Sequence, residues 1–226
     1  MKRLSSVDGA IVMCGGKGER MGMRDKGCVF FNGKPVALRV VESARRNGLV
    51  VVFAFVKGRT SCSASYAGEA GALLVETPGD GYVEDLRWIA KWAYDKLFWK
   101  RALILACDLP LISKSVVARI LDQLPDSPWV SFLVEGEDLT KKGFNAGSGL
   151  LYSSVSAVDL SALLKARPTE EIPYSSVKYS PAEEVWDFDT QDDLRAFGAL
   201  KFRTGSRHTK LGIFPLGPIF LGQFHY

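Results

Sequence analysis

The residues of this chain best suited to chemistry are glycines and cations that follow its first apolar run. After Ala10–Met13 the chain continues as Cys14-Gly15-Gly16-Lys17-Gly18-Glu19-Arg20-Met21-Gly22. Glycines let backbone N–H groups approach phosphate oxygens closely, and Lys17 and Arg20 add positive charge. Two familiar phosphate loops do not fit: Gly18 stands where a P-loop needs serine or threonine, and Met21 where a dinucleotide fingerprint needs glycine. The pattern predicts another kind of phosphate site, with a tight turn bearing solvated charges as the alternative.

Two more residues could act beside phosphates. Lys26 follows the glycine loop closely enough to reach the α-phosphate of a nucleotide, although its spacing alone favours a surface lysine. Asp108 follows the apolar run Ala102–Ala106, and a buried carboxylate is unfavourable there unless it is paired or binds a cation. Mg²⁺ prefers oxygen ligands and accompanies nucleotide phosphates. Asp108 is therefore a candidate metal ligand, with capping of the following turn as the alternative.

A second glycine segment lies between an apolar run and a helical pattern. Gly79 and Gly81 allow the backbone to approach a planar ligand. Glu84 and Asp85 follow in the first turn of the expected helix. They could contact the ligand, although complementing the helix dipole is the simpler interpretation.

Carboxylates recur in the segment Trp186–Thr190, where the period of a strand would put Asp187 and Asp189 on one face. The two histidines, His208 and His225, both lie in the C-terminal tail, which excludes a histidine-based triad in the body. Cations, backbone donors and carboxylates suit phosphoryl or nucleotidyl transfer, because that chemistry depends on positioning and charge stabilisation.

The elements that position these residues alternate between apolar runs and helical patterns. Strands are expected at Ala10–Met13, Leu49–Val56, Ala72–Val75, Ala102–Ala106 and Trp129–Val134. Continuous apolar runs are typical of parallel strands buried on both faces. Helices are expected over Val83–Leu97, after a Ser113 cap, and after Thr190. The pattern predicts an α/β three-layer, Rossmann-like fold with a mostly parallel central sheet, in which ligands bind beyond the carboxyl ends of the strands.

Charge divides the chain into two parts. Of its 226 residues 29 are basic and 25 acidic, and residues 198–226 contain four of the basic groups and no acidic ones. We therefore expect a neutral domain over 1–197 and a basic, apolar extension over 198–226. A neutral body argues against a nucleic-acid partner, which needs a basic face. We expect the apolar extension to cover a surface of the body or of a second copy, as in a homodimer, with a disordered basic extension that attracts an anionic partner as the alternative.

Compartment can be judged from cysteines and apolar runs. The chain has four cysteines, at 14, 28, 62 and 107, with no CxxC pair, and we expect buried thiols in a reducing cytoplasm. No signal peptide is evident, and the longest apolar stretch, Leu211–Phe224, is too short and proline-rich for a membrane span. The sequence therefore predicts a cytoplasmic protein.

The motifs resemble those of a known superfamily. The loop Gly15–Gly22 with Lys26 is similar to the signature of nucleotidyltransferases of the molybdenum-cofactor guanylyltransferase type. Cys107–Pro110 resembles the metal-binding strand end of that superfamily, and Asp187–Leu194 resembles its closing motif. Gly79–Leu86 looks most like the archaeal adenosylcobinamide-phosphate guanylyltransferases, as does Ala146-Gly147. The resemblance covers roughly residues 9–197.

The resemblance implies transfer of a guanylyl group from GTP to the phosphate of adenosylcobinamide phosphate, with Mg²⁺ as cofactor and pyrophosphate as the other product. It implies nucleotide binding by Cys14, Gly15, Gly16, Lys17, Gly18, Gly79, Gly81 and Glu84. It implies catalytic roles for Arg20 at the leaving pyrophosphate, Lys26 at the α-phosphate and Asp108 on the metal, with Asp189 as the second metal ligand. The acceptor phosphate is already anionic, so no general base is needed.

Several positions depart from the superfamily pattern. Gly27 replaces the usual proline after the lysine, Glu19 replaces a small hydroxyl residue, and Asp187 and Asp189 replace asparagines. Molybdopterin guanylyltransferase and sugar-1-phosphate nucleotidylyltransferase remain alternative enzymes. A nucleotide-binding regulatory homologue without turnover is the alternative of another class.

Overall fold

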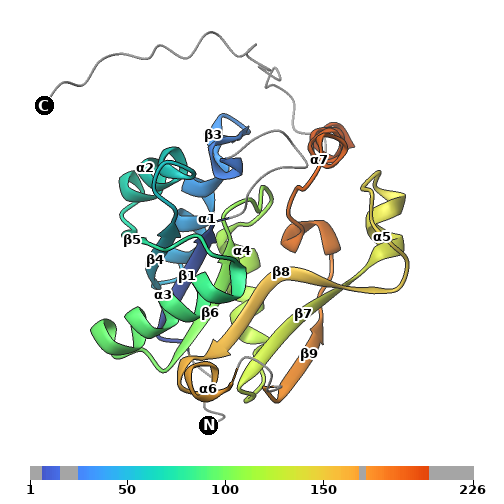
Figure 1. Cartoon of the computed structure of the whole chain (residues 1–226). Helices are drawn as coiled ribbons and strands as arrows, with labels where there is room; N and C mark the ends of the chain where they lie inside the picture. The colour runs from blue at the N-terminus through green and yellow to red at the C-terminus, as the bar shows by residue number, and fades with distance from the viewer. Residues whose placement is uncertain (1–6, 16–24, 168–171, 204–226) are drawn as a thin grey trace, which may run out of the picture.

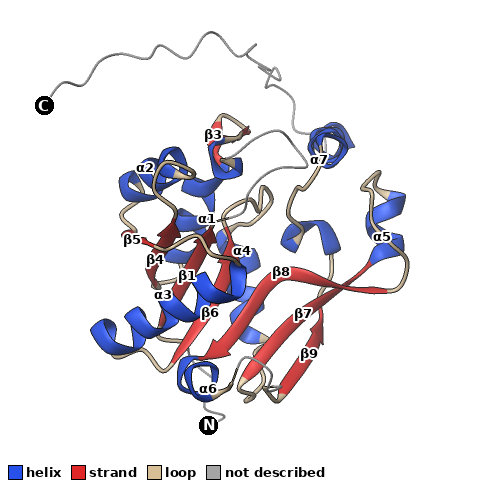
Figure 2. Ribbon diagram, viewed as in Figure 1, coloured by secondary structure: helices blue, strands red, loops and turns tan. Residues whose placement is uncertain are grey.

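A computed structural model describes residues 7–15, 25–167 and 172–203 of this chain. Its centre is a seven-stranded sheet (Figures 1 and 2). The strands follow the order β5 (Leu73–Glu76), β4 (Val50–Phe55), β1 (Gly9–Cys14), β6 (Arg101–Ala106), β8 (Leu150–Asp159), β7 (Trp129–Glu135) and β9 (Tyr174–Lys178). Neighbours from β5 to β6 are parallel, β8 is antiparallel to both β6 and β7, and β9 is parallel to β7. The carboxyl ends of β5, β4, β1 and β6 therefore share one edge.

Helices cover both faces of the sheet and complete the three layers (Figure 2). One face packs against α1 (Val36–Arg45), α2 (Ser61–Glu69), α4 (Lys114–Asp122), α5 (Gly136–Lys141) and α7 (Gln191–Arg203). The other packs against α3 (Tyr82–Leu97) and α6 (Leu160–Lys165). Two 3₁₀ turns, η2 (Lys26–Cys28) and η3 (Ala182–Val185), and a small hairpin of β2 (Phe30–Phe31) and β3 (Lys34–Pro35) complete the described elements.

The predicted fold class is confirmed, and each of the five predicted strands is present. All residues of β1 are buried, as its continuous apolar run indicates. The predicted helix after Ser113 is also confirmed, because the Ser113 hydroxyl accepts a hydrogen bond from the Val116 N–H at 3.3 Å. The strands β8 and β9 were not predicted, since serines interrupt the apolar run of β8 and β9 is a short edge strand.

The cysteine prediction is half wrong. Cys14 and Cys107 are buried free thiols, as expected, but Cys28 and Cys62 form a disulfide between η2 and α2. A spacing of 34 residues gives no sign of this pairing, because folding alone brings the two Cα atoms to 6.1 Å. Cysteine usage therefore gives no support for a reducing compartment. Among the described helices, none has the length and apolar character to cross a membrane.

Candidate active site

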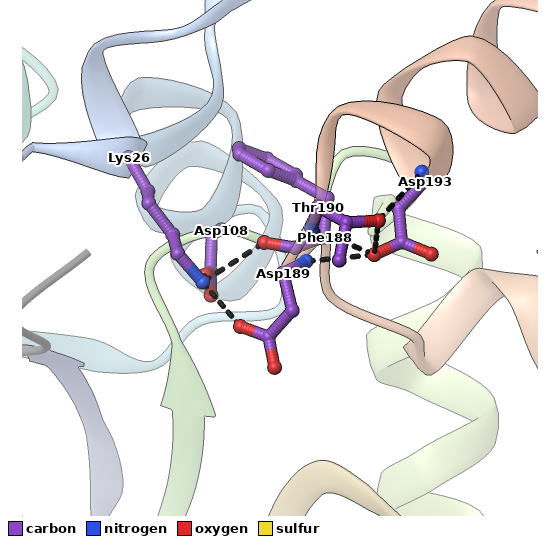
Figure 3. A network of polar contacts seen from close by, with 6 residues as sticks. All are labelled: Lys26, Asp108, Phe188, Asp189, Thr190 and Asp193. Atoms are coloured by element: carbon purple, nitrogen blue, oxygen red, sulfur yellow. Dashed lines mark hydrogen bonds and ion pairs between the residues drawn. The ribbon is translucent and has the colours of Figure 1, made fainter. Parts of the chain in front are cut away.

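A lysine and two carboxylates from distant parts of the chain meet at the carboxyl edge of the sheet (Figure 3). Lys26 comes from η2, Asp108 from the loop after β6, and Asp189 from the segment before α7. The Lys26 Nζ lies 3.2 Å from Asp108 Oδ2 and 2.5 Å from Asp189 Oδ1. It also donates a hydrogen bond to the Phe188 carbonyl at 2.9 Å. The predicted grouping of these three side chains is present.

The first turn of α7 fixes the position of Asp189. The buried Asp193 carboxylate accepts hydrogen bonds from the N–H groups of Asp189 and Thr190, at 3.0 and 2.9 Å, and from the Thr190 hydroxyl at 2.8 Å. In return the Thr190 hydroxyl accepts from the Asp193 N–H at 3.2 Å. This reciprocal cap satisfies donors at the start of the helix. It holds the backbone from which Asp189 reaches Lys26 (Figure 3).

The cap also explains why one prediction is wrong. Trp186–Thr190 was expected to be a strand, but the segment is not paired with the sheet. The backbone N–H of Asp189 binds the Asp193 carboxylate instead of a neighbouring strand. Asp187 and Asp189 nevertheless share one electrostatic environment, because both interact with Lys26.

Burial and mutual repulsion perturb the carboxylates. Burial, followed by the charge of Asp187, raises the pKa of Asp108 to about 7, although Lys26 acts in the opposite direction. Burial and the charge of Asp189 raise the pKa of Asp187, against a hydrogen bond from the Ser154 side chain. Burial alone would lower the pKa of Lys26, but Asp108 and Asp189 outweigh it and raise that pKa. The lysine therefore stays protonated at neutral pH.

The site suits a divalent cation by its charge and donor atoms. Asp108, Asp187 and Asp189 provide three carboxylates against the single ammonium of Lys26, and oxygen donors are the ligands that Mg²⁺ prefers. Burial is the largest cause of the raised pKa values of Asp108 and Asp187, and the charge of a neighbouring carboxylate adds to it. Further positive charge at the site would favour the ionised form of both carboxylates. The three carboxylates do not all lie within 4.8 Å of one another, and the Lys26 ammonium stands between two of them.

Beside this cluster, two glycine segments are tied together by residues that the sequence analysis did not assign. Arg59 donates a hydrogen bond to the Gly15 carbonyl at 3.1 Å, and its Nη1 lies 3.4 Å from where a Cβ on Gly79 would be. Asp85 accepts a hydrogen bond from the Gly79 N–H at 2.8 Å, and its other oxygen lies 3.1 Å from a Cβ position on Gly15. Arg59 and Asp85 thus join the start of the predicted phosphate loop to the second predicted glycine segment at Gly79.

The other predicted residues of this edge differ in their placement. Gly79 and Gly81 have φ values of 81° and 147°, which glycine adopts readily, and Glu84 is exposed beside them. Cys14 ends β1 with its side chain in the core, where it hydrogen-bonds Cys107 and helps to raise the pKa of that thiol. Gly16, Lys17, Gly18 and Arg20 lie outside the described residues.

In the sequence, Asp85 could contact a ligand or complement the helix dipole, and the helix dipole was the simpler interpretation. Its burial and its bond to Gly79 show that it organises the turn before α3. Arg59 follows β4 by four residues, and strand-end position in a parallel sheet is the signal that could have identified it.

Comparisons with known proteins agree with this geometry. Residues 10–171 match the MobA-like NTP transferase domain. A molybdenum cofactor guanylyltransferase of Pseudomonas putida is 28% identical over 113 residues, which cover 49% of this chain and 55% of that protein. The match thus spans about half the length of that relative.

Solved structures share the fold at low sequence identity. A nucleotidyl transferase from Methanothermobacter thermautotrophicus superimposes with a TM-score of 0.65 at 18% identity, covering 88% of this chain and all (100%) of that one. A protein described as a glucose-1-phosphate thymidylyltransferase of Bacillus anthracis gives a TM-score of 0.62 at 14% identity, covering 89% and 97% of the two chains.

Proposed function

Because this chain belongs to the MobA-like NTP transferase family, we propose that it transfers a guanylyl group from GTP to a phosphorylated acceptor and releases pyrophosphate. The observation that carries this proposal is the cluster of Lys26, Asp108 and Asp189 beside Gly15 at the carboxyl edge of the sheet. Nucleotidyl transfer needs positive charge at the α-phosphate and a held metal ion rather than a general base. The guanine preference is supported by the guanylyltransferase name of the Pseudomonas relative and by the resemblance of Gly79–Leu86.

Lys26 would act at the α-phosphate. Its ammonium stays charged because of Asp108 and Asp189, so it can stabilise negative charge that develops as the α-phosphate is attacked. Gly15 begins the loop that we assign to the β- and γ-phosphates, together with Gly16, Lys17 and Gly18. Arg20 would stabilise the leaving pyrophosphate.

Asp108 and Asp189 would hold Mg²⁺, with Asp187 as a further carboxylate. The metal would neutralise phosphate charge and orient the reacting oxygens. The protein contributes by keeping the carboxylates in place through the α7 cap and the hydrogen bond from Ser154 to Asp187. Bringing in positive charge would relieve their mutual repulsion.

We infer that the acceptor is bulky, and we propose adenosylcobinamide phosphate. On one face of the sheet, α3 packs over β5, β4, β1 and β6, and α6 packs against α3 and the end of β8. The same face of β8, β7 and β9 continues beyond these two helices (Figure 1). There the ladder places Tyr152 opposite Leu133, and Tyr152 and Tyr174 are 63% and 62% exposed and hydrogen-bonded to each other. Ser154, two residues along β8 from Tyr152, hydrogen-bonds Asp187 and thus connects this surface to the carboxylates. Aromatic rings beside a reaction centre suit the stacking of a large acceptor more than the binding of a small sugar phosphate.

A matrix of substrates tests the proposal. The purified chain with Mg²⁺ is supplied with GTP, ATP or CTP and with adenosylcobinamide phosphate, molybdopterin or glucose 1-phosphate, and pyrophosphate release is measured. We expect GTP with adenosylcobinamide phosphate to be at least ~10-fold faster than any other pair, a difference of about 1.4 kcal/mol. If another acceptor is preferred, the chain is still a nucleotidyltransferase, but the proposal that adenosylcobinamide phosphate is its acceptor is wrong. GTP binding without release for any acceptor would instead support the regulatory homologue.

A further inference from the structure

The Cys28–Cys62 disulfide lies next to the lysine of the active site. Cys28 is the last residue of η2, the short turn that begins with Lys26, and Cys62 lies in the first turn of α2. Cys62 is exposed and Cys28 is partly buried. The bond therefore joins the backbone that carries Lys26 to a helix on the sheet, and one of its sulfur atoms belongs to an exposed residue.

A second attachment holds the other end of the same turn. Asp25, directly before η2, accepts hydrogen bonds from the Ser63 N–H at 3.0 Å and from the Ser63 hydroxyl. Between the two attachments, Gly27 packs so closely that a Cβ there would lie 2.4 Å from Ser63 Oγ and 2.9 Å from Ala37 Cβ. The turn is therefore pressed onto α1 and α2 on either side of Lys26.

The two attachments have different chemistry. The Asp25–Ser63 hydrogen bonds need only the folded helix, whereas the Cys28–Cys62 bond exists only in the oxidised protein. Lys26 itself extends toward Asp108 and Asp189, so its position depends on how firmly η2 is held on α2. Loss of one attachment would leave the turn held from a single side.

We propose that Cys28 and Cys62 form a redox modification site whose partner is a dithiol, and that their oxidation state controls how firmly Lys26 is positioned. In the reductive direction, a thiolate of the dithiol attacks Cys62 Sγ and the Cys28–Cys62 bond breaks. Cys28 leaves as a thiolate and takes up a proton. The second thiol of the reductant then attacks the mixed disulfide and releases Cys62 as a thiol. Two electrons and two protons pass to the protein, and the reductant leaves as its own disulfide.

After reduction, the Cys28 thiol would have a hydrogen-bonding partner in the structure. Ser63 Oγ lies 3.7 Å from Cys28 Sγ, within range of a weak hydrogen bond to sulfur. Asp25, Cys28 and Cys62 also place three possible ligand atoms within 4.8 Å of one another. Because both Asp25 oxygens already bind Ser63, we assign the pair to thiol–disulfide exchange rather than to a metal ion.

The first test counts thiols. After unfolding without reductant, we expect two of the four cysteines, Cys14 and Cys107, to react with iodoacetamide, and all four after reduction, with peptide mapping to locate the pair. Four labels without reductant would overturn the assignment. The assignment would also be overturned if the reduced protein retained one equivalent of zinc and the Cys28→Ser variant did not.

The second test measures Lys26 directly and does not depend on turnover. Isotope-coded acetylation compares Lys26, whose side chain is 15% exposed, with the exposed control Lys114 in oxidised and reduced protein. We expect the ratio of Lys26 to Lys114 labelling to rise at least ~3-fold on reduction. The double variant Cys28→Ser/Cys62→Ser should give the ratio of the reduced protein both with and without reductant. An unchanged ratio would show that the bond does not control the lysine.

The kinetic readout rests on the proposed function. At a temperature well below unfolding, reduction should lower kcat about 3- to 10-fold with less than ~2-fold change in KM for GTP, because a positioned charge acts mainly in the transition state. The double serine variant should not respond to the reductant.

Reduction should also lower Tm by about 5–15 °C. A lower Tm with unchanged kcat and unchanged Lys26 labelling would mean that the bond only stabilises the fold. Absence of turnover in both redox states would count against the proposed function, while the labelling result would still decide this inference.

Discussion

The Lys26 ammonium and the Asp189 carboxylate lie 2.5 Å apart although the two residues are 163 positions apart in the chain. The contact joins the loop after the first strand to the segment before the last described helix (Figure 3). Asp108 contacts the same ammonium at 3.2 Å, so the lysine lies at the centre of this cluster. The Phe188 carbonyl accepts a further hydrogen bond from this ammonium at 2.9 Å, and the Lys26 side chain is 15% exposed.

Replacing Lys26 tests its role in the transition state. We expect Lys26→Ala to lower kcat by at least ~100-fold and to raise KM for GTP less than ~5-fold, since charge at the α-phosphate grows during the reaction. Lys34, which is partly exposed and pairs with Glu42, provides the matched control Lys34→Ala, with kcat within ~2-fold of the unaltered protein. A change confined to KM would make Lys26 a ground-state ligand instead.

The cap of α7 should act on catalysis through Asp189. Asp193→Ala removes the acceptor of the Asp189 and Thr190 N–H groups, so we expect loss of about 1–2 kcal/mol of stability and a several-fold lower kcat. Asp192→Ala, at the exposed neighbouring position, should change stability by less than ~0.5 kcal/mol. Thermal unfolding and steady-state kinetics measure the two effects. Equal kinetic effects of the two variants would show that the cap does not position the carboxylate.

The raised pKa of Asp108 predicts how stability depends on pH in the metal-free protein. Between the ordinary value of 3.8 and the folded value of about 7, the folded protein binds a proton that the unfolded chain has lost. Its unfolding free energy therefore falls as pH rises through this range. Asp108→Asn lacks this titration, so its Tm relative to the unaltered protein should rise between pH 5 and pH 8 by at least roughly 2–4 °C.

Mg²⁺ provides the matching control for that experiment. A cation that binds only the folded state stabilises it, and Asp108 is the central ligand in our assignment. Mg²⁺ at pH 8 should therefore raise the Tm of the unaltered protein more than that of Asp108→Asn. A Tm difference that stays constant from pH 5 to pH 8 would contradict the assigned titration.

The C-terminal extension remains a prediction from the sequence. The helix α7 continues to Arg203, and residues 204–226 lie outside the described part of the chain. We propose that this apolar segment covers a surface of the body or of a second copy and supplies no catalytic group. Deletion of 204–226 should lower the particle mass in light scattering or expose apolar surface to a dye, with kcat within ~3-fold. Loss of turnover in a folded protein of unchanged particle mass would place the tail at the active site.

The central sheet was predictable because its strands are apolar on both faces. Runs such as Ala102–Ala106 leave little alternative to a parallel sheet covered by helices, and strand ends then indicate where Asp108 and the glycine loop must lie. β8 was missed for the opposite reason, because Ser153, Ser154 and Ser156 interrupt its apolar run.

The contacts within the site depend on long-range packing that a single sequence does not contain. Asp85 and Arg59 have no unusual local pattern, and their roles follow from the proximity of Gly15 to Gly79 across the sheet edge. Asp189 was correctly grouped with Asp108, but the strand that was expected to carry it is absent. The hydrogen bond from the Asp189 N–H to Asp193 holds the segment instead. The Cys28–Cys62 pair is likewise visible only after folding.

The most direct test follows the α-phosphate of GTP. The chain is incubated with Mg²⁺, GTP labelled with ³²P at the α-phosphate, and adenosylcobinamide phosphate, and the products are separated by chromatography. We predict that the label appears in the acceptor in equal amount to the pyrophosphate released, and that Asp108→Asn reduces the rate at least ~100-fold, about 2.7 kcal/mol of transition-state stabilisation. Two results would contradict the account. In the first, the label stays in GTP or appears as free GMP with this acceptor, and also with molybdopterin and with glucose 1-phosphate. In the second, Asp108→Asn has a normal rate.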